Sequence, residues 1–471
     1  MTNPLIDILK KNNKYFIYKV SSCYPLSQKL IDKHKDKWGW NWVGLSSNKF
    51  LPWSTELIEK YKAKWDWTGL GLSGNHGLPW SAELIETFKD KWDWKKLSSN
   101  EKIPWSSDLL EKYQNELNWD GYGLSGNKGL VWTIDLIEKF KHKWRWDWDG
   151  LSTNASLPWT DRLLEKYKDK WDWKYISGNE SIPWTLELIK KYENELSWNE
   201  DIPGWMITRN LFLPSLSYNK NLPWSSVLIE KYRDKWDWEA LSYSKNIPWS
   251  LDLIEQFKDY WKWGSAGLSE NTKLPWSFEL IEKYENNWDW NWAGLSRNQN
   301  LPWTTELIDK YLDKWGWSSL SFNKKLPWSE KFVERYKDKW DWMHLSLNQS
   351  IPLSIELLEK YKDKWHWSVL SKNKNLPWSI ALIDKFKDKW YWDQITLNES
   401  IPWSIELLEK FKGKWHWQSG LQNSALPWTV EAFNNYKEKQ DVSFLIENNT
   451  QWKKEFNVLS LDENLIEQII I

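Results

Sequence analysis

The chain is poor in features that mark secreted, membrane-spanning and metal-binding proteins. It has one cysteine in 471 residues, Cys23, which excludes a disulfide framework or a thiolate metal site within one chain. It has no run of about 20 apolar residues that could span a bilayer. Its start, MTNPLIDILKKNNKYF, has no basic region followed by a long apolar stretch. We therefore expect a cytoplasmic protein without a signal peptide or a membrane partner.

An excess of charge of one sign is missing as well. Lys and Arg total 64 against 65 for Asp and Glu, a net charge of −1. Such a balance supplies no counterion-release drive toward nucleic acid and no polybasic patch for a membrane. Runs such as KYKDKW interleave the two signs, which suits a solvated face. We predict no nucleic-acid partner.

Groups arranged for catalysis are also absent from the pattern. The six histidines occupy different positions, except His366 and His416, which share one slot two repeats apart. Carboxylates recur in every predicted helix. Such repetition is typical of a solvated helix face, whereas a catalytic acid/base pair would occur once. No Gly-rich phosphate loop, Ser-His-Asp order or metal-ligand spacing occurs. We predict no catalytic residue, no metal, no cofactor and no enzymatic activity.

What the chain has in abundance is tryptophan, 47 residues, at fixed positions of a tandem repeat. Proline anchors, with Val131 in one slot, recur at spacings of 25 or 27 residues and once of 40, giving 16 copies. The consensus is L-P-W-S-x-E-L-I-E-K-Y-K-D-K-W-D-W-x-x-L-S-x-N. A period in this range indicates stacked units, because no copy can bury its apolar face alone.

The first half of each copy predicts a helix. In residues 52–65, Ser54 is a good N-cap, and apolar residues from Leu57 to Trp65 recur at helical spacing on one face. We expect a helix of about 12 residues and roughly 18 Å.

The second half predicts a short return path. Residues 94–97 suit one helical turn, and a variable link precedes an L-S-x-N turn in which Asn takes the position that tolerates left-handed backbone. The longest copy carries its extra segment in this link, around 199–215. Six copies have two extra residues there, and each places Gly before the Leu: Gly44, Gly71, Gly123, Gly150, Gly267 and Gly294.

These patterns favour an all-α tandem-repeat solenoid of about 16 repeats. Residues 1–22 form an N-terminal cap, 23–437 the array and 438–471 a C-terminal cap or tail, whose NLIEQIII could cover the last repeat or meet a partner. The alternative is a leucine-rich-repeat-like α/β solenoid, because L-S-x-N followed by L-P is similar to that pattern. The residue five before the Asn, such as Lys95, is not apolar, which argues against the alternative.

The motif W-D-W-x-x-L-S-x-N, as at 92–100 and 340–348, resembles a Trp-rich tandem repeat found in proteins of giant viruses and some bacteria. The resemblance covers about 24–437. Those relatives more often follow the Asn with Pro-Asn and have a shorter intervening helix, so this chain departs from them there. The resemblance implies a solenoid-like repeat array and no established activity.

The tryptophans fall into three main slots: the L-P-W slot and the two positions of W-x-W. Leu replaces Trp in the first two of these, as at Leu353 and Leu117, which a packing site tolerates and a flat stacking platform does not. The second W-x-W slot allows two interpretations: core, with its indole N–H bonded to a carbonyl of the next repeat, or exposed for binding. We assign to the core Trp53, Trp92, Trp94 and Trp249.

The favoured function is a non-enzymatic scaffold that binds a protein or peptide along an extended surface. The x residue of L-S-x-N varies from Gly to Arg and Phe, so it must point outward, and loops on a rigid scaffold often carry binding residues. The larger anchor-type residues in this slot are Tyr218, Tyr243, Arg297 and Phe322. Alternatives are self-association through the C-terminal tail and a carbohydrate-binding tryptophan ladder.

Overall fold

A computed structural model describes residues 13–35, 42–199, 215–291, 294–416, 423, 425–426, 463 and 466–467. The chain divides into two units, Met1–Asp237 with Phe456–Ile471, and Trp238–Glu455. The predicted insertion lies outside the described residues from 200 to 214. Most of both predicted end segments also lies outside them, so the predicted domain boundaries stay a prediction.

Within the described residues every regular element is helical, which confirms the all-α class and gives no support to the α/β alternative. The elements of unit 1 are α2 (Asn13–Cys23), α3 (Gln28–His34), α4 (Trp42–Ser47), α5 (Thr55–Lys60), η1 (Leu72–Gly74), α6 (Ala82–Thr87), α7 (Trp94–Ser99), α8 (Ser107–Lys112), α9 (Ile134–Lys139), η2 (Leu151–Thr153), α10 (Asp161–Lys166), α11 (Trp173–Gly178), α12 (Leu186–Lys191), η3 (Leu216–Tyr218) and α14 (Ser226–Lys231). Those of unit 2 are α15 (Trp238–Tyr243), α16 (Leu251–Gln256), η4 (Leu268–Glu270), α17 (Phe278–Lys283), η5 (Leu295–Arg297), α18 (Thr305–Lys310), α19 (Trp317–Phe322), α20 (Glu330–Arg335), α21 (Trp342–Leu347), α22 (Ile355–Lys360), α23 (Trp367–Leu370), α24 (Ile380–Lys385), α25 (Trp392–Leu397) and α26 (Ile405–Lys410).

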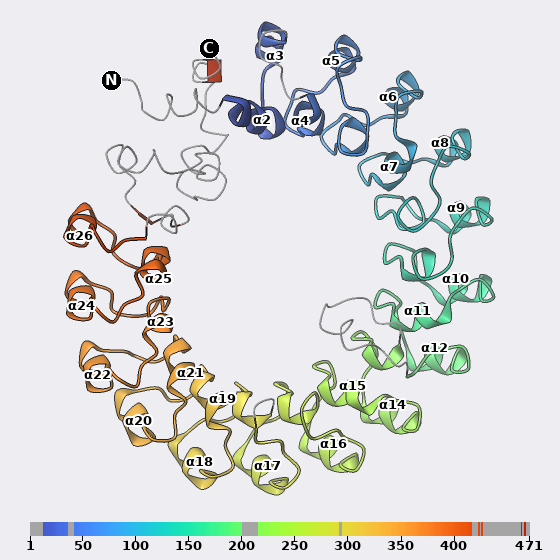
Figure 1. Cartoon of the computed structure of the whole chain (residues 1–471). Coiled ribbons are helices and arrows are strands. Elements are labelled where there is room, and N and C mark those ends of the chain that lie inside the picture. The colour runs from blue at the N-terminus through green and yellow to red at the C-terminus, as the bar shows by residue number, and fades with distance from the viewer. Residues whose placement is uncertain are drawn as a thin grey trace. The chain divides into compact units, whose positions relative to one another are not determined.

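In each unit the elements form two rows, visible in Figure 1. The first row holds the helices that follow L-P-W, such as α5, α6 and α8, and the second holds the α- and 3-10-helices around L-S-x-N. Neighbours in the second row pack on one another, as α7 does on η1 and α21 on α19. Each first-row helix buries an adjacent pair of apolar residues, most often Leu-Ile, and both Ile58 and Ile85 are fully buried.

The first-row helices are shorter than the sequence predicts: α5 has six residues instead of about 12. Ser54 caps it as expected, since its hydroxyl accepts from the Leu57 N–H at 3.2 Å. The helix ends at Tyr61, whose φ of −117° and ψ of 23° leave the helical region. The chain then continues in turns, with the Trp65 N–H bonded to the Tyr61 carbonyl at 3.2 Å. The apolar spacing thus runs past the helix end.

The first W-x-W tryptophan caps the short helix, and the second bonds the turn that follows it. A helix leaves its last carbonyls without internal partners. In the repeat that contains α5, the Trp65 indole N–H donates to the Ile58 carbonyl at 3.0 Å and that of Trp67 to the Lys62 carbonyl at 3.0 Å. The prediction that the second W-x-W indole bonds to the next repeat is therefore wrong for its N–H. Its ring does reach the next repeat, 4.9 Å from the ring of Trp92.

The lengthened copies need glycine for close approach. In the copy with Gly71, the Leu72 N–H donates to the Asp66 carbonyl at 2.8 Å, closing the link. A Cβ on Gly71 would lie 2.0 Å from that carbonyl oxygen. The copy with the long insertion closes in the same way, because the Leu216 N–H donates to the Ser197 carbonyl at 2.8 Å. Insertions in the link therefore leave the hydrogen bond that closes it in place.

The Asn of L-S-x-N has a different role from the one predicted. Asn75 has extended backbone, with φ −78° and ψ 117°, so the expected left-handed position is wrong. Its amide instead donates to the Ser46 carbonyl of the preceding repeat at 2.8 Å, and its Oδ1 accepts from the Gly77 N–H at 2.7 Å. Among the described non-glycine residues the one with positive φ is Ala266. No helix in the described ranges is long and apolar enough to cross a membrane.

Candidate interaction surface

The variable x residue of each L-S-x-N lies between two hydrogen-bonded neighbours. In the repeat of α21, the Ser346 hydroxyl donates to the Trp342 carbonyl at 2.7 Å and accepts from the His366 N–H of the next repeat at 3.0 Å. On the other side of x, the Asn348 amide donates to the Ser321 carbonyl of the preceding repeat at 3.0 Å. The x residue itself, Leu347, is 40% exposed. The frame holds the backbone while the side chain is free to vary.

The structure places the four predicted binding residues at the C-terminal ends of second-row elements. Tyr243 ends α15, Arg297 ends η5 and Phe322 ends α19, all in unit 2, and all three are exposed. Tyr218 ends η3 in unit 1, is half-buried, and donates its hydroxyl to Asp237 at 3.2 Å. They share one slot of the repeat.

The contact between Tyr218 and Asp237 identifies a second variable slot beside the first. Asp237 is the middle residue of W-x-W in the next repeat, and its N–H donates to Ser217, next to Tyr218, at 3.0 Å. The same bond recurs in other repeats, as between the Tyr391 N–H and Ser371 at 3.0 Å. We call the two slots together, within each unit, the turn strip. The variation of this second slot from Asp to Lys, Gly, Tyr and His is visible in the sequence, but only the hydrogen bond between repeats places it beside the first slot.

Where the middle residue is Asp, it often caps the second-row helix. Asp341 accepts from the N–H groups of Met343 at 3.0 Å and His344 at 3.1 Å. Burial acts to raise the pKa of Asp341, but hydrogen bonds from Ser318 and His344 outweigh it and lower the pKa to about 2. A carboxylate in this slot thus stabilises the helix start.

In three consecutive repeats of unit 2 this slot holds His366, Tyr391 and His416, and all three side chains are exposed. The starts of α23 and α25 have no side-chain cap bond at His366 and Tyr391, as is also true of α11 at Asp172. Tyr391 is 53% exposed, unusually open for an aromatic residue. These repeats carry solvent-facing rings in a slot where Asp341 caps its helix.

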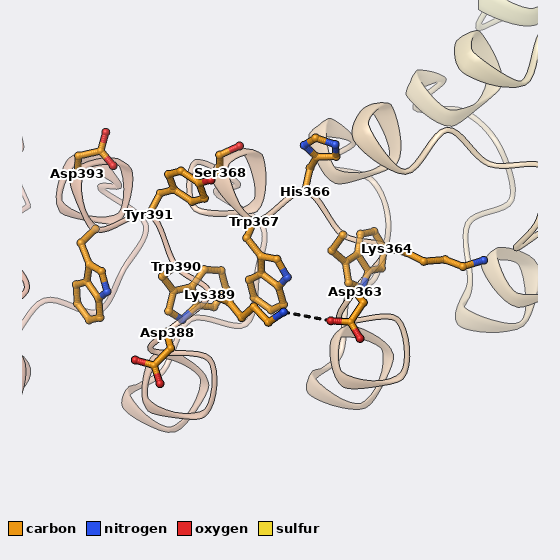
Figure 2. A pocket seen from close by; sticks show the side chains of 12 residues that line it. Asp363, Lys364, His366, Trp367, Ser368, Asp388, Lys389, Trp390, Tyr391 and Asp393 are labelled. Atoms are coloured by element: carbon orange, nitrogen blue, oxygen red, sulfur yellow. Dashed lines mark hydrogen bonds and ion pairs between the residues drawn. The ribbon is translucent and has the colours of Figure 1, made fainter.

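Two of these rings line a cleft of about 630 Å³ between neighbouring repeats. Figure 2 shows His366 and Tyr391 at one end and the Asp363–Lys389 ion pair, at 3.1 Å, at the other. The indole of Trp367 lies between them and is bonded to the Lys362 carbonyl at 2.7 Å. The cleft therefore combines an aromatic wall with a charged rim.

The charged rim belongs to a ladder of ion pairs between repeats. Asp338 pairs with Lys364 at 3.3 Å and Asp388 with Lys414 at 3.0 Å, in the same way as Asp363 with Lys389. Alternating signs along the ladder balance the charge of this face. The turn strip, in contrast, differs in charge and size from repeat to repeat.

The four tryptophans assigned to the core differ in burial. Trp92 is 5% exposed, and its indole N–H donates to the Ile85 carbonyl at 3.0 Å. Trp53, Trp94 and Trp249 are half-buried. The ring of Trp249 lies 4.9 Å from that of Trp261, and that of Trp94 lies 4.5 Å from Tyr113 of the next repeat. All four rings take part in aromatic packing or in bonds to backbone carbonyls.

Comparisons of the chain with protein-family models, curated proteins and solved structures found no match. Over the described residues, no group of three or more His, Cys, Asp or Glu is placed to hold a metal ion. The geometry of the turn strip and the cleft is thus the basis for a functional proposal.

Proposed function

We propose that the chain is a cytoplasmic repeat solenoid that acts as a non-enzymatic scaffold and binds an extended protein or peptide segment along the turn strip. One observation carries the proposal: a hydrogen-bonded frame that recurs in most repeats displays a side chain whose identity varies widely along the array. Ser346 and Asn348 hold the backbone on both sides of Leu347, so substitution at this slot leaves the frame intact. Rigid backbones with variable exposed side chains suit recognition of extended partners.

The chemistry of the strip in unit 2 favours a peptide with both apolar and charged side chains. Tyr243, Phe322 and Tyr391 offer aromatic area at low conformational cost, and Arg297 adds a planar cation. The cleft beside Tyr391 adds a recess of about 630 Å³ whose rim carries Asp363 and Lys389. Such mixed surfaces resemble interface centres, where aromatic residues and Arg supply most of the affinity.

The packing of the second-slot indoles disfavours the carbohydrate ladder. A stacking platform needs a free ring face. The ring of Trp342 is 4.7 Å from Trp365 of the next repeat, and the Lys364 ammonium lies 5.3 Å from its centroid. Tryptophan fluorescence with a panel of oligosaccharides tests this alternative, because saturable quenching by a sugar would support it.

A peptide library displayed on phage, selected against the full chain, tests the proposal. Peptides that bind should lose about tenfold or more in affinity when Tyr243, Arg297 and Phe322 are together replaced by Ala. The matched control is Glu356→Ala, an exposed residue on α22 away from the strip. The melting temperature should change by no more than a few degrees in either variant. Undiminished binding in the triple variant would rule out the strip as the binding surface.

A further inference from the structure

Two acidic residues near the C-terminus contact the first repeat. Glu463 accepts from the Ser27 N–H, at the start of α3, at 2.9 Å. Glu467 accepts from the Lys33 ammonium at 2.6 Å and lies 3.3 Å from His34 Nε2. Ile466, between them on the same helical face, is fully buried. The described part of the tail therefore covers the first repeat. The prediction that the tail covers the last repeat is wrong for these residues.

These contacts reproduce those between adjacent interior repeats. Asp32 of α3 pairs with Lys60 at 2.7 Å and accepts from the Tyr61 hydroxyl of the next repeat. In the same way Glu86 pairs with Lys112 at 2.7 Å and accepts from Tyr113. In all three cases one acid faces a Lys and the following ring of the next helix. Glu467 stands where an acid of a preceding repeat would stand.

The sequence of the tail matches this position. Residues 465–467 are Leu-Ile-Glu, the triplet found at 57–59 and 84–86 in α5 and α6. Ile466 is buried as completely as Ile58 and Ile85, which occupy the same place in the triplet. The agreement covers both the apolar and the charged part of the interface.

A repeat ahead of the first one would also need a second-row element, and α2 lies in that position. The Asn48 amide donates to the Ser21 carbonyl in the last turn of α2 at 2.9 Å and to the carbonyl of Tyr24, directly after α2, at 2.8 Å. Interior Asn residues make these bonds to the preceding repeat, as Asn75 does to Ser46. Helix α2 packs on α4 and thus fills the second row, whereas the tail fills the first.

One residue sets the docking site on α3 apart. His34 occupies the slot that holds Tyr or Phe in the other copies, such as Tyr61 and Phe88. It is 3% exposed, so its ring is enclosed beside the tail. Hydrogen bonds from Lys33, and then from His34, lower the pKa of Glu467. The tail carboxylate is thus bound by two basic side chains, the buried His34 and the more exposed Lys33.

We propose that the C-terminal segment is a surrogate repeat helix that docks on α3 of its own chain and, together with α2, completes a composite repeat ahead of the first one. The last consensus copy is unsuited to replace it, because Asn434 stands where most copies have the acid. The docking site on α3 recognises a helix that carries Leu-Ile followed by an acidic residue.

Hydrogen exchange measured by mass spectrometry on the full chain tests the proposal. Glu467→Lys should raise exchange in peptides covering 27–35 by about tenfold or more, since a docked helix suppresses local opening. Lys33→Glu should do the same, and the double variant, with the charges exchanged, should recover protection. Restored protection in the double variant excludes simple misfolding of either single variant.

The tail contains its own control, a second Leu-Ile-Glu at 445–447, outside the described residues. Glu447→Lys should leave exchange at 27–35 unchanged. A rise with Glu447→Lys, or none with Glu467→Lys, would overturn the proposal. Light scattering should give the molar mass of one chain over the concentrations used. Protection that appears only with dimers would mean that the tail docks on a second copy, which contradicts docking within the chain.

Discussion

Each tryptophan slot contributes two kinds of interaction, one through the ring and one through the indole N–H. The ring of Trp92 packs against Trp67, 4.9 Å away, and its N–H satisfies the last turn of α6. Burying an indole removes around 200 Å² from water, or about 5 kcal/mol gross. The buried indole of the first W-x-W position and the mostly half-buried indoles of the other two slots compensate for first-row helices of only six residues, which have little stability of their own.

Truncation of Trp92 should therefore destabilise its region. We expect Trp92→Ala to cost about 3–5 kcal/mol, in the range of large core truncations. Trp92→Leu should cost clearly less, because Leu117 and Leu196 occupy this slot in other copies. Urea unfolding followed by circular dichroism measures both. Equal losses for Ala and Leu would mean that burial is not the main contribution.

The buried Asn residues tie neighbouring repeats together. The Asn323 amide donates to the carbonyls of Ser296 at 3.1 Å and Asn298 at 3.2 Å, and its Oδ1 accepts from the Lys325 N–H at 2.9 Å. Asn323 is 2% exposed, so removing the amide takes buried hydrogen bonds from the Ser296 carbonyl and the Lys325 N–H, while the Asn298 carbonyl keeps its bond from the Trp303 indole at 3.0 Å.

Asn323→Ala should cost about 1–3 kcal/mol, the penalty for buried unsatisfied groups. A matched control is Asn375→Ala, because Asn375 also donates to the preceding repeat, at 2.6 Å to the Gln349 carbonyl, but is exposed. Its loss should be within about 0.5 kcal/mol. Thermal unfolding of the two variants compares them directly. A larger loss for Asn375→Ala would contradict the role of burial.

At the scale of elements, the residue before each second-row helix can either cap the helix or expose a ring to solvent. Asp341 caps α21, whereas Tyr391 leaves α25 without a side-chain cap bond. Because caps at this position are worth about 1 kcal/mol, Tyr391→Asp should raise stability by up to about that amount. Asp341→Ala should lower it by about the same amount.

The same variants connect stability with the proposed function. Tyr391→Asp should weaken a peptide that contacts the cleft while it raises the melting temperature. Differential scanning calorimetry and a binding titration on one preparation measure both. Unchanged binding together with a higher melting temperature would show that the exposed ring serves no partner at this site.

At the scale of the whole molecule, the glutamates that bond to lysines and tyrosines of the next repeat predict how stability depends on pH. The carboxyl pKa values of Glu86, Glu138 and Glu255 are lowered from 4.5 to about 2, mainly by hydrogen bonds from lysines and then from a tyrosine hydroxyl of the next repeat. Since the folded pKa lies below the unfolded one, this stabilisation is complete above pH 4.5 and is lost as pH falls from 4.5 toward 2.

The melting temperature should therefore be nearly constant from pH 7 to 5 and fall below about pH 4.5. Each exposed pair contributes little and is screened by salt, so the effect should arise from their sum. Circular dichroism melts over this range, at low and high salt, provide the measurement. A fall that begins above pH 6 would contradict this origin, because none of these three carboxyls titrates there.

The sequence by itself determined the period, the helical class and the apolar faces. Ser54, Ile58 and the other periodic residues predict a capped amphipathic helix, because capping and burial are local patterns that repeat in every copy. It also predicted the variable x slot, since tolerance of Gly, Arg and Phe is visible in the copies. Helix length was overestimated, because apolar spacing continues through the turns after Tyr61.

Only the tertiary structure decided the contacts made over long sequence distances. The sequence predicts a local turn role for Asn75, but its side-chain amide donates to the Ser46 carbonyl, 29 residues away. The contact of Glu467 with Lys33 spans 434 residues, so no local pattern could reveal which repeat the tail covers. Likewise, the second slot of the turn strip lies beside the first because a hydrogen bond joins successive repeats. Hydrogen-bond partners and burial are set by how the copies stack, and the physical chemistry of one copy does not contain that information.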